Sequence, residues 1–391
     1  MQLSVIIVSY NVKYYLEQCL RSVIKATKYA NIQWEAFIVD NASQDNSIAH
    51  LQNIFSKEQY PMLHYIANAR NVGFSRANNQ AIKQAKGDYI LFLNPDTIVS
   101  EQIFQYLFEF VANQTNIGTI GTRMIADNGK FAKESRRSLP TPWVSFCKMT
   151  GLTTLFPRSK TFAKYYMGYL DRNIPHETEI LSGAFMFTSK KALQQCGDFD
   201  ESFFMYGEDI DLSYRFKQGG FKNYYVPIHI LHYKGESTHK NSFRYTHVFY
   251  EAMLIFFKKH YGHLSWMFTF PIKCAIIFRA LITLISQQIN SLFPTTDTTD
   301  TFAFIGNLKN FTQAEQLAQK WQFNIRYVGE HLEKIPTNHE ALKNATHILT
   351  DISCINYGEP LTYIANSNHK KSIAFFYPDT QTIITSKDIY I

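Results

Sequence analysis

The sequence has little cysteine, little proline and no regular glycine repeat, and each of these absences excludes a class of protein. Its five cysteines are scattered, odd in number and without a CxxC pair, so we expect neither a disulfide framework nor a zinc cluster. Only 18% of the 391 residues are charged and 46% are hydrophobic, which excludes a disordered chain. The lack of glycine or proline periodicity excludes a fibre. We therefore expect a globular protein of two or three domains in a reducing cytosol.

A strong net charge of either sign is also missing. The chain has 39 Lys and Arg against 32 Asp and Glu, which gives a formal net charge of +7. This mild basic excess suits an anionic ligand or a membrane surface, but it falls well short of a dedicated nucleic-acid binder. No nucleic-acid partner is expected.

The sequence has no uncharged apolar run long enough to cross a membrane. Residues 248–289 are rich in Phe, Ile, Leu and Met, but they contain four basic residues, Lys258, Lys259, Lys273 and Arg279. Two interpretations of similar weight remain open. Either this amphipathic segment lies on a membrane surface, where basic and aromatic residues suit the headgroup boundary, or it forms a buried helical hairpin.

The first hundred residues alternate apolar runs with helical patterns, which is typical of parallel strands joined by crossover helices. The first run has no basic leader and is too short for a signal peptide, so we interpret it as a strand. The predicted strands are Leu3 to Ser9, Trp34 to Val39, Met62 to Ala67 and Tyr89 to Leu93. Ligands of such sheets bind beyond the carboxyl ends of the strands. The polar segments near these ends are Ser9–Asn11, Asp40–Asp45, Asn71–Phe74 and Asn94–Thr97.

The rest of the chain is less regular at first and then ordered again. Four prolines between Arg123 and Ile180 predict a long, partly mobile stretch over the binding edge. A buried strand is expected at Leu181–Phe187, followed by helices at Ser189–Cys196 and Glu208–Gln218. Residues 291–300 have the composition of a linker. Candidate strands at 302–305, 324–328, 346–349, 372–376 and 382–385 then predict a small α/β domain.

Three groups of residues could carry chemistry. Asp96, on the Asn94-Pro95-Asp96 turn after an apolar strand, is placed to hold a hard divalent cation such as Mg²⁺, although these residue types also form ordinary turns. Three acids, Glu208, Asp209 and Asp211, crowd the first turn of a predicted helix. They either complement the helix dipole or raise the pKa of one carboxylate enough for general-base work.

The third group follows another apolar strand and contains His232. A lone histidine is more often structural, but imidazole is a borderline ligand for Mg²⁺ and a better one for Mn²⁺. His229 is the competing candidate. Arg136 and Arg137, in the irregular region, either clamp an acceptor phosphate or form a solvated charge pair.

Seven motifs, in this order, resemble the GT-A family 2 glycosyltransferases, and the bacterial rhamnosyltransferase-like members most of all. They read VSYN (8–11), VDNASQDNS (39–47), NVGFSRANNQAI (71–82), GDYILFLNPDT (87–97), LSGAFMF (181–187), GDFDESFFMYGEDIDLSYR (197–215) and HYKGEST (232–238). The resemblance covers residues 2 to 245 and does not extend to the last 90 residues. It implies a GT-A, Rossmann-like catalytic domain, that is, an α/β nucleotide-diphospho-sugar transferase fold.

The resemblance also implies roles for individual residues. Tyr10 and Asp40 would contact the nucleobase of a nucleotide-sugar donor, and the ribose and diphosphate would be lined by Asn71, Gly73 and Asn79. Asp96 matches the last Asp of the DxD motif and would bind a Mg²⁺ or Mn²⁺ ion that bridges the diphosphate. Asn94 stands where many members have the first Asp, and it is counted among the residues expected to bind the nucleotide sugar.

The same comparison places the acid–base chemistry. Asp209 matches the expected general base of the family, with Glu208 beside it, and His232 matches the histidine that completes the metal site. The reaction implied is a single displacement that inverts the anomeric centre. Ser182, Gly183 and Ala184 either leave room for the sugar or simply pack closely.

We therefore predict an inverting, metal-dependent glycosyltransferase on the cytoplasmic face of a membrane, which extends a lipid-linked surface glycan. The expected division is a catalytic domain at 1–245, an amphipathic helical segment at 246–290, a linker at 291–301 and a small α/β domain of unknown role at 302–391. The alternative is a non-catalytic sugar-nucleotide or glycan-binding module on the same fold. A sugar-phosphate nucleotidyltransferase is disfavoured because Ser9-Tyr10-Asn11 is not a glycine-rich, arginine-containing loop.

Overall fold

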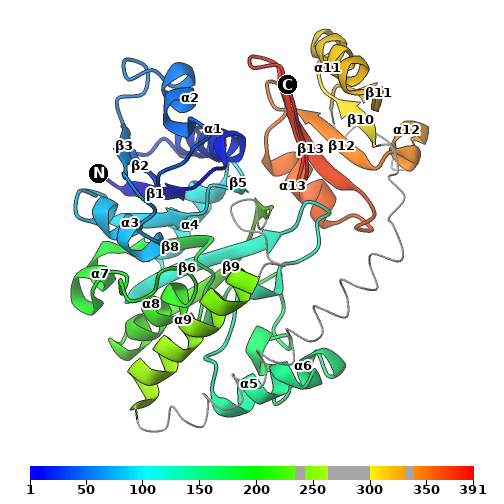
Figure 1. Ribbon diagram of the computed structural model, residues 1–391. Helices are drawn as coiled ribbons and strands as arrows, with labels where there is room; N and C mark the ends of the chain where they lie inside the picture. Colours follow the sequence, from blue (N-terminus) through cyan, green and yellow to red (C-terminus); the bar gives the residue numbers. More distant parts are fainter. Residues whose placement is uncertain (234–242, 263–299, 332–338) are drawn as a thin grey trace.

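The computed structural model describes residues 1–233, 243–262, 300–331 and 339–391 (Figure 1). They form two β-sheets with helices packed on their faces. The larger sheet is built from residues 3–232 and the smaller one from residues 301–390. The predicted linker up to residue 299 and residues 263–290 of the predicted amphipathic segment lie outside the described residues.

The larger sheet opens with the predicted alternation of strands and helices. Strands β1, β2, β3 and β4 are parallel, and the chain alternates them with helices in the order β1 (Leu3–Ser9), α1 (Lys13–Ala30), β2 (Trp34–Asp40), α2 (Ser47–Ile54), β3 (Leu63–Ala67), α3 (Phe74–Ile82) and β4 (Tyr89–Leu93). Each strand agrees with its expected range to within a residue. The sequence prediction of an α/β fold with a Rossmann-like opening is therefore confirmed.

The sheet then becomes mixed, in the order β3-β2-β1-β4-β8-β6-β9-β5 with β7 pairing to β9. Its remaining elements are β5 (Thr97–Val99), α4 (Ile103–Ala112), β6 (Ile117–Ile125), the 3₁₀ turns Lys133–Ser135 and Lys164–Tyr166, α5 (Pro142–Met149), α6 (Leu152–Leu155), β7 (His176–Thr178), β8 (Phe185–Ser189), α7 (Lys190–Cys196), α8 (Glu208–Gln218), β9 (Lys222–His232) and α9 (Phe243–Tyr261). The strand expected at Leu181–Phe187 begins only at Phe185. The preceding residues instead contact α8.

The core of this sheet explains why its strands read as continuous apolar runs. Leu3, Val5 and Ile7 of β1 pack into one cluster with side chains of α1 and α4, and Ile6 and Val8 pack into another with side chains of α3, α7 and α8. A strand that is buried on both faces needs an apolar residue at every position. The helices thus leave the strand ends as the place for polar groups.

The smaller sheet has the order β11-β10-β12-β13-β14-β15, and its first four strands are parallel. Its elements are β10 (Thr301–Ile305), α11 (Leu308–Trp321), β11 (Asn324–Gly329), α12 (Glu340–Asn344), β12 (His347–Asp351), α13 (Gly358–Ala365), β13 (Ser372–Tyr377), β14 (Thr382–Ile384) and β15 (Ile389–Tyr390). All five strands expected from the sequence between residues 302 and 385 are present.

The two sheets are joined by a shared apolar cluster at the edge that carries β5 and the end of β9 (Figure 1). Ile98 of β5 and Leu231 of β9 belong to the same buried cluster as Tyr357 and Ile364 of the second unit. Polar contacts flank it, because the Glu101 carboxylate accepts hydrogen bonds from the backbone N–H of Tyr357 at 2.7 Å and of Gly358 at 3.0 Å. The smaller sheet therefore supports the edge of the larger one.

Candidate functional site

Asp96 and His232 meet where β5 pairs with β9. The turn after β4 carries Asn94 and Asp96, and Thr97 at the start of β5 lies opposite His232 in the antiparallel pairing. The Oδ1 atom of Asp96 lies 3.3 Å from Nε2 of His232, and Nδ2 of Asn94 lies 3.4 Å from the same nitrogen. The backbone N–H of Tyr233 donates to the Asp96 carbonyl at 3.0 Å, which fixes the register. Two segments 138 residues apart thus bring a carboxylate, an amide and an imidazole together.

The structure also separates the two histidine candidates. His229 and His232 are three residues apart on one strand, so their side chains leave opposite faces of the sheet. Burial, with help from Arg123 and Arg172, lowers the pKa of His229 to about 4. His232 is the histidine that contacts Asp96, so the structure brings together the two residues predicted as metal ligands.

The donor atoms around His232 fit a small divalent cation. Carboxylate and amide oxygens are hard ligands, imidazole is a borderline one, and Mg²⁺ or Mn²⁺ takes its other ligands from water and phosphate. Nδ1 of His232 is buried, and no hydrogen-bond partner for it occurs in the described part of the chain. Within residues 1–233, 243–262, 300–331 and 339–391, no three His, Cys, Asp or Glu side chains gather as a complete metal cluster. A cation here would depend on Asp96 and His232 together with a ligand, and Asn94 could join them only with its amide turned to present Oδ1 in place of Nδ2.

Asp209 is linked to this group through the backbone before β8. It lies in the first turn of α8, and its Oδ2 atom accepts hydrogen bonds from the Gly183 N–H at 3.0 Å and from Arg137 at 2.5 Å. The next residue, Ala184, accepts from the Asn94 N–H at 3.0 Å. The Gly183–Ala184 backbone thus connects the carboxylate of Asp209 to the turn that carries Asp96.

One of the three crowded acids, Glu208, has a raised pKa. Its burial, reinforced by the neighbouring charge of Asp209, raises the pKa of Glu208 to about 8. Its Oε2 atom is buried and makes no hydrogen bond to the described residues. Glu208 is therefore protonated at neutral pH and cannot accept a proton there. Asp211 behaves differently, since His260, Arg215 and Lys259 overcome its burial and lower its pKa to about 2.

The ends of β1 and β2 carry the residues predicted to contact a nucleobase. Asp40 lies opposite Ser9 in the parallel pairing, and its Oδ2 atom accepts the Ser43 N–H at 3.0 Å. Its Oδ1 atom is buried and finds no hydrogen-bond donor in the described part of the molecule. Tyr10, by contrast, is 37% exposed. An unpaired acceptor and an exposed aromatic ring thus occur on adjacent loops.

Asn71, Gly73 and Asn79 hold the chain that leads into α8. Gly73 has φ +86°, and a Cβ atom there would lie 2.7 Å from the Phe204 carbonyl oxygen. Oδ1 of Asn71 accepts the Gly73 N–H at 3.0 Å. Both amide atoms of Asn79 are used by the Phe199 backbone, Nδ2 at 2.8 Å and Oδ1 at 3.1 Å. These contacts give the three residues a structural role in addition to the donor-binding role expected of them.

Sequence reasoning missed that Arg137 is the ion-pair partner of Asp209. The two residues are 72 positions apart, and only the antiparallel bridge between Arg137 and Ile180 aligns them. Arg136 and Arg137 do not form a solvated charge pair. Arg136 is buried and donates to the carbonyl oxygens of Leu170 and Asp171.

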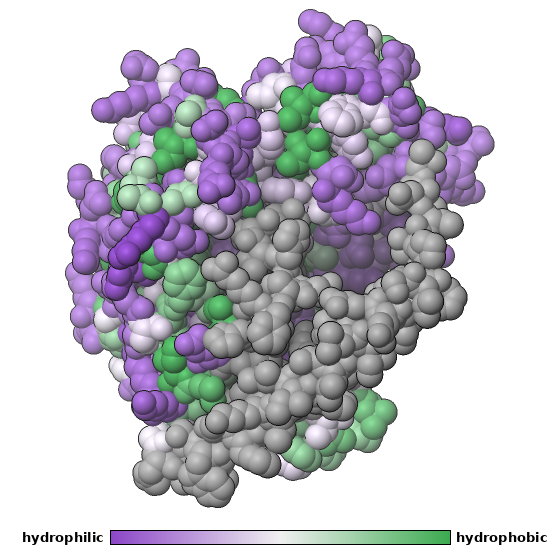
Figure 2. Space-filling model, viewed as in Figure 1, coloured by the Kyte–Doolittle hydropathy of each residue, from purple (hydrophilic) through white to green (hydrophobic). Residues whose placement is uncertain are grey.

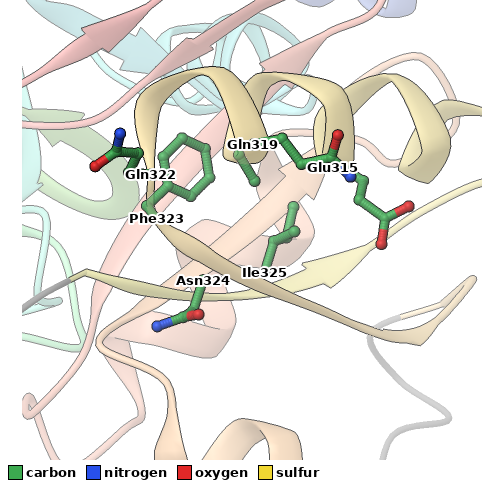
Figure 3. A pocket seen from close by; sticks show the side chains of 7 residues that line it. Glu315, Gln319, Gln322, Phe323, Asn324 and Ile325 are labelled. Carbon is green, nitrogen blue, oxygen red and sulfur yellow. The ribbon is translucent and has the colours of Figure 1, made fainter.

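One depression lies outside this group, between α11 and β11 of the smaller sheet (Figure 3). Its seven lining residues are Glu315, Ala318, Gln319, Gln322, Phe323, Asn324 and Ile325. It shares no residue with the Asp96 and Asp209 groups. Its lining contains a single carboxylate and no histidine or cysteine.

Comparison with known proteins identifies the family of the chain. The model of glycosyl transferase family 2 matches residues 4–197, about half of the chain. The chain belongs to this family. Family 2 relatives include the N-acetylglucosaminyl-diphospho-decaprenol L-rhamnosyltransferase of Mycobacterium tuberculosis, 26% identical over 278 residues, which cover 68% of this chain and 86% of the relative. Rhamnosyltransferase WbbL of Escherichia coli is 27% identical over 208 residues, or 48% of this chain and 72% of that protein.

Among solved structures, this glycosyltransferase is similar to the mannosyltransferase PcManGT of Pyrobaculum calidifontis, which was solved with GDP-Man and Mn²⁺. The TM-score is 0.45 at 13% identity, over 75% of this chain and 81% of that one. In the described part of the family 2 chain, no helix is both long and apolar enough to span a bilayer.

Proposed function

We propose that this family 2 glycosyltransferase is an inverting enzyme that depends on a divalent cation. It would move a sugar from a nucleotide-diphosphate donor to a hydroxyl group of a glycan acceptor. The observation that carries the proposal is the 3.3 Å contact between Asp96 and His232, connected to Asp209 through the Gly183–Ala184 backbone. One group suits a metal and a diphosphate, and the other suits proton transfer.

The donor would lie along the carboxyl ends of β1, β2 and β4. The unpaired Oδ1 atom of Asp40 would accept a hydrogen bond from the nucleobase, and the ring of Tyr10 offers a stacking surface. Asp96 and His232, with Asn94, would hold Mg²⁺ or Mn²⁺. When bound, such a cation stabilises the negative charge that develops on the leaving diphosphate.

Asp209 is placed to act as the general base. Its carboxylate takes the proton from an acceptor hydroxyl, while Arg137 and the Gly183 N–H fix its orientation. The neighbouring Glu208 stays protonated at neutral pH, so that the site carries one negative charge fewer. Attack from the face opposite the diphosphate inverts the anomeric centre in a single displacement.

The acceptor is proposed to be lipid-linked and the reaction to take place on the cytoplasmic face of a membrane. The support is the name of the mycobacterial relative, in which the acceptor part is N-acetylglucosaminyl-diphospho-decaprenol. We further propose the division into a catalytic domain at 1–245, a helical segment at 246–290, a linker at 291–301 and a small domain at 302–391.

Replacing Asp209, the proposed general base, tests whether the protein is an enzyme or a binding module. In Asp209→Asn, transfer from nucleotide sugars with Mg²⁺ or Mn²⁺ should fall about 10²- to 10⁴-fold while donor affinity persists. Asp96→Ala should instead weaken cation-dependent donor binding, measured by calorimetry. Asp88→Asn is the matched control, because Asp88 is exposed and precedes β4 at the end opposite Asn94.

Two outcomes would contradict the proposal. Transfer by Asp209→Asn at the wild-type rate would remove Asp209 from the chemistry. A wild-type protein that binds nucleotide sugars but turns none of them over, across a broad acceptor panel, would favour the non-catalytic binding module.

A further inference from the structure

Residues 135–170, which contain α5 and α6, have no acidic residue. The same 36 positions hold six cations, Arg136, Arg137, Lys148, Arg158, Lys160 and Lys164, whereas the whole chain has 32 Asp and Glu. Arg158, Lys160 and Lys164 are exposed. This stretch therefore presents positive charge with no carboxylate of its own to balance it.

A row of aromatic rings lies in the same stretch. The rings of Trp143 and Phe146 stack at a centroid distance of 5.8 Å, Phe162 lies 6.2 Å from Trp143, and Phe156 lies 5.3 Å from Phe162. Three of the four are exposed to solvent by nearly half of their surface, Trp143 by 48%, Phe146 by 51% and Phe156 by 46%, and the adjoining Leu155 by 70%. Exposed apolar side chains that touch one another form a patch, which isolated ones do not.

Packing against the described residues does not explain this row. The inner face of α5 is already filled, because Val144 and Cys147 are buried against the fold. The outer face carries Trp143 and Phe146, so α5 is apolar on both faces, whereas a surface helix normally has one polar face. Green colouring along the lower edge of Figure 2, where Figure 1 places α5 and α6, marks the same surface.

We propose that α5, α6 and the chain to Lys164 form a contact surface for a membrane with anionic lipids. Aromatic and leucine side chains flanked by Lys and Arg are the composition that lies at the boundary between headgroups and acyl chains. The absence of acids matters, since each Lys or Arg near such a surface adds attraction that a carboxylate would cancel. This surface is made of other residues than the segment 246–290, for which the sequence left membrane contact and a buried helical hairpin equally open.

The surface is close to the candidate base along the chain. Arg137, whose guanidinium pairs with Asp209, is only five residues before Pro142 at the start of α5. Contact through α5 and α6 would hold the Asp209 carboxylate near the headgroup layer, where the hydroxyl of a lipid-linked glycan is found. This consequence rests on the proposed function, whereas the membrane contact itself does not.

The test is binding of the full chain to vesicles without donor or acceptor. We expect flotation with phosphatidylglycerol-containing vesicles, weaker binding to pure phosphatidylcholine, and loss of binding at high salt. The double variant Leu155→Ser/Lys160→Glu should bind about tenfold less tightly. Its matched control is Leu308→Ser/Lys309→Glu, an exposed Leu and an exposed Lys at the start of α11, which should bind as the wild type does.

A second measurement uses Trp143 itself. Brominated phospholipids quench only a tryptophan that enters the membrane, so Trp143→Phe should remove quenching that the wild type shows.

Transfer to a water-soluble acceptor should be equal in Leu155→Ser/Lys160→Glu and the wild type. This result separates the proposed membrane contact from the assignment of Asp209 as the general base. The proposal would be overturned if Leu155→Ser/Lys160→Glu bound vesicles as the wild type does. It would also be overturned if sedimentation showed that this variant had lost only self-association of the protein.

Discussion

The two sheets of this molecule place carboxylates at the same structural position and use them differently. Asp40 ends β2 of the larger sheet with one buried oxygen unpaired by any described residue. Asp351 ends β12 of the smaller sheet fully buried, and both of its oxygens accept hydrogen bonds. Oδ2 accepts from Asn307 N–H at 3.3 Å and Asn310 Nδ2 at 2.8 Å, and Oδ1 from Ser353 N–H at 3.0 Å and Oγ at 2.7 Å.

Close packing seals the position around Asp351. A Cβ atom on Gly306 would lie 2.2 Å from the Asp351 Cβ, so only glycine fits between the ends of β10 and β12. Parallel sheets put polar groups at their carboxyl edge in both cases. Only a carboxylate that lacks protein donors is left for a ligand, so the same architecture gives a candidate site in one sheet and a structural cap in the other.

Removing each carboxylate tests this contrast most strongly. Asp351→Ala leaves several buried donors without an acceptor and should lower the free energy of unfolding by about 3 to 5 kcal/mol in urea denaturation. Asp40→Ala removes an acceptor that the protein itself uses only in part. It should change stability by less than about 1 kcal/mol and raise the KM for the donor about tenfold.

The comparison fails if the two variants exchange these effects. A stable Asp351→Ala protein with impaired transfer would place a functional site in the smaller sheet. The kinetics are therefore measured on the folded fraction of each variant, at a temperature well below its unfolding midpoint.

The same contrast explains how far the sequence could predict the site. Apolar runs locate the strands, so the positions of Asp40, Asp96 and His232 at strand ends follow from periodicity. The ion pair of Arg137 with Asp209 does not, because it depends on a bridge in a region without periodic pattern. Burial is also a property of packing, so the sequence alone could not tell which of the adjacent acids has a raised pKa, and it is Glu208 whose burial raises it.

In the stretch expected to be irregular, one of the prolines begins a helix. Four prolines between Arg123 and Ile180 predicted a long, partly mobile stretch, and within it Pro142 is the first residue of α5, which Thr141 caps by accepting the Val144 N–H. Proline suits the first turn of a helix, where its missing N–H is not needed. In a sequence, the same residue type, proline, can begin a helix or break one. Here only the preceding Thr141, which caps the helix, distinguishes the two.

Glu208 sharpens the comparison, because it is a buried carboxyl group that lacks the donors Asp351 has. Its pKa is raised from 4.5 to about 8, so the folded state binds a proton that the unfolded state releases between these pH values. Its contribution to stability is complete below pH 4.5 and is lost as the pH rises to about 8. The slope is about 1.4 kcal/mol per pH unit.

Glu208→Gln should therefore flatten the stability curve over this range and be more stable than the wild type at pH 8. Urea denaturation at intervals from pH 5 to pH 8.5 measures the difference. Glu177→Gln, on an exposed glutamate of β7, is the control and should leave the wild-type slope unchanged. A wild-type curve with the same slope as that of Glu208→Gln over this range would mean that Glu208 is already ionised in the folded protein at pH 5.

The smallest effect is expected where the two sheets meet. The Glu101 carboxylate accepts from two N–H groups at the start of α13, so Glu101→Ala removes a cap that one sheet provides for a helix of the other. The cost should be about 1 to 2 kcal/mol, because the shared apolar cluster around Ile98 and Tyr357 remains. In Glu101→Ala, the amides of Tyr357 and Gly358 should exchange hydrogen faster than in the wild type. The control Glu109→Ala, at an exposed position of α4, should leave their exchange unchanged. Unchanged protection of α13 would mean that the apolar cluster alone joins the sheets, and that the smaller sheet supports the β5 edge without help from this carboxylate.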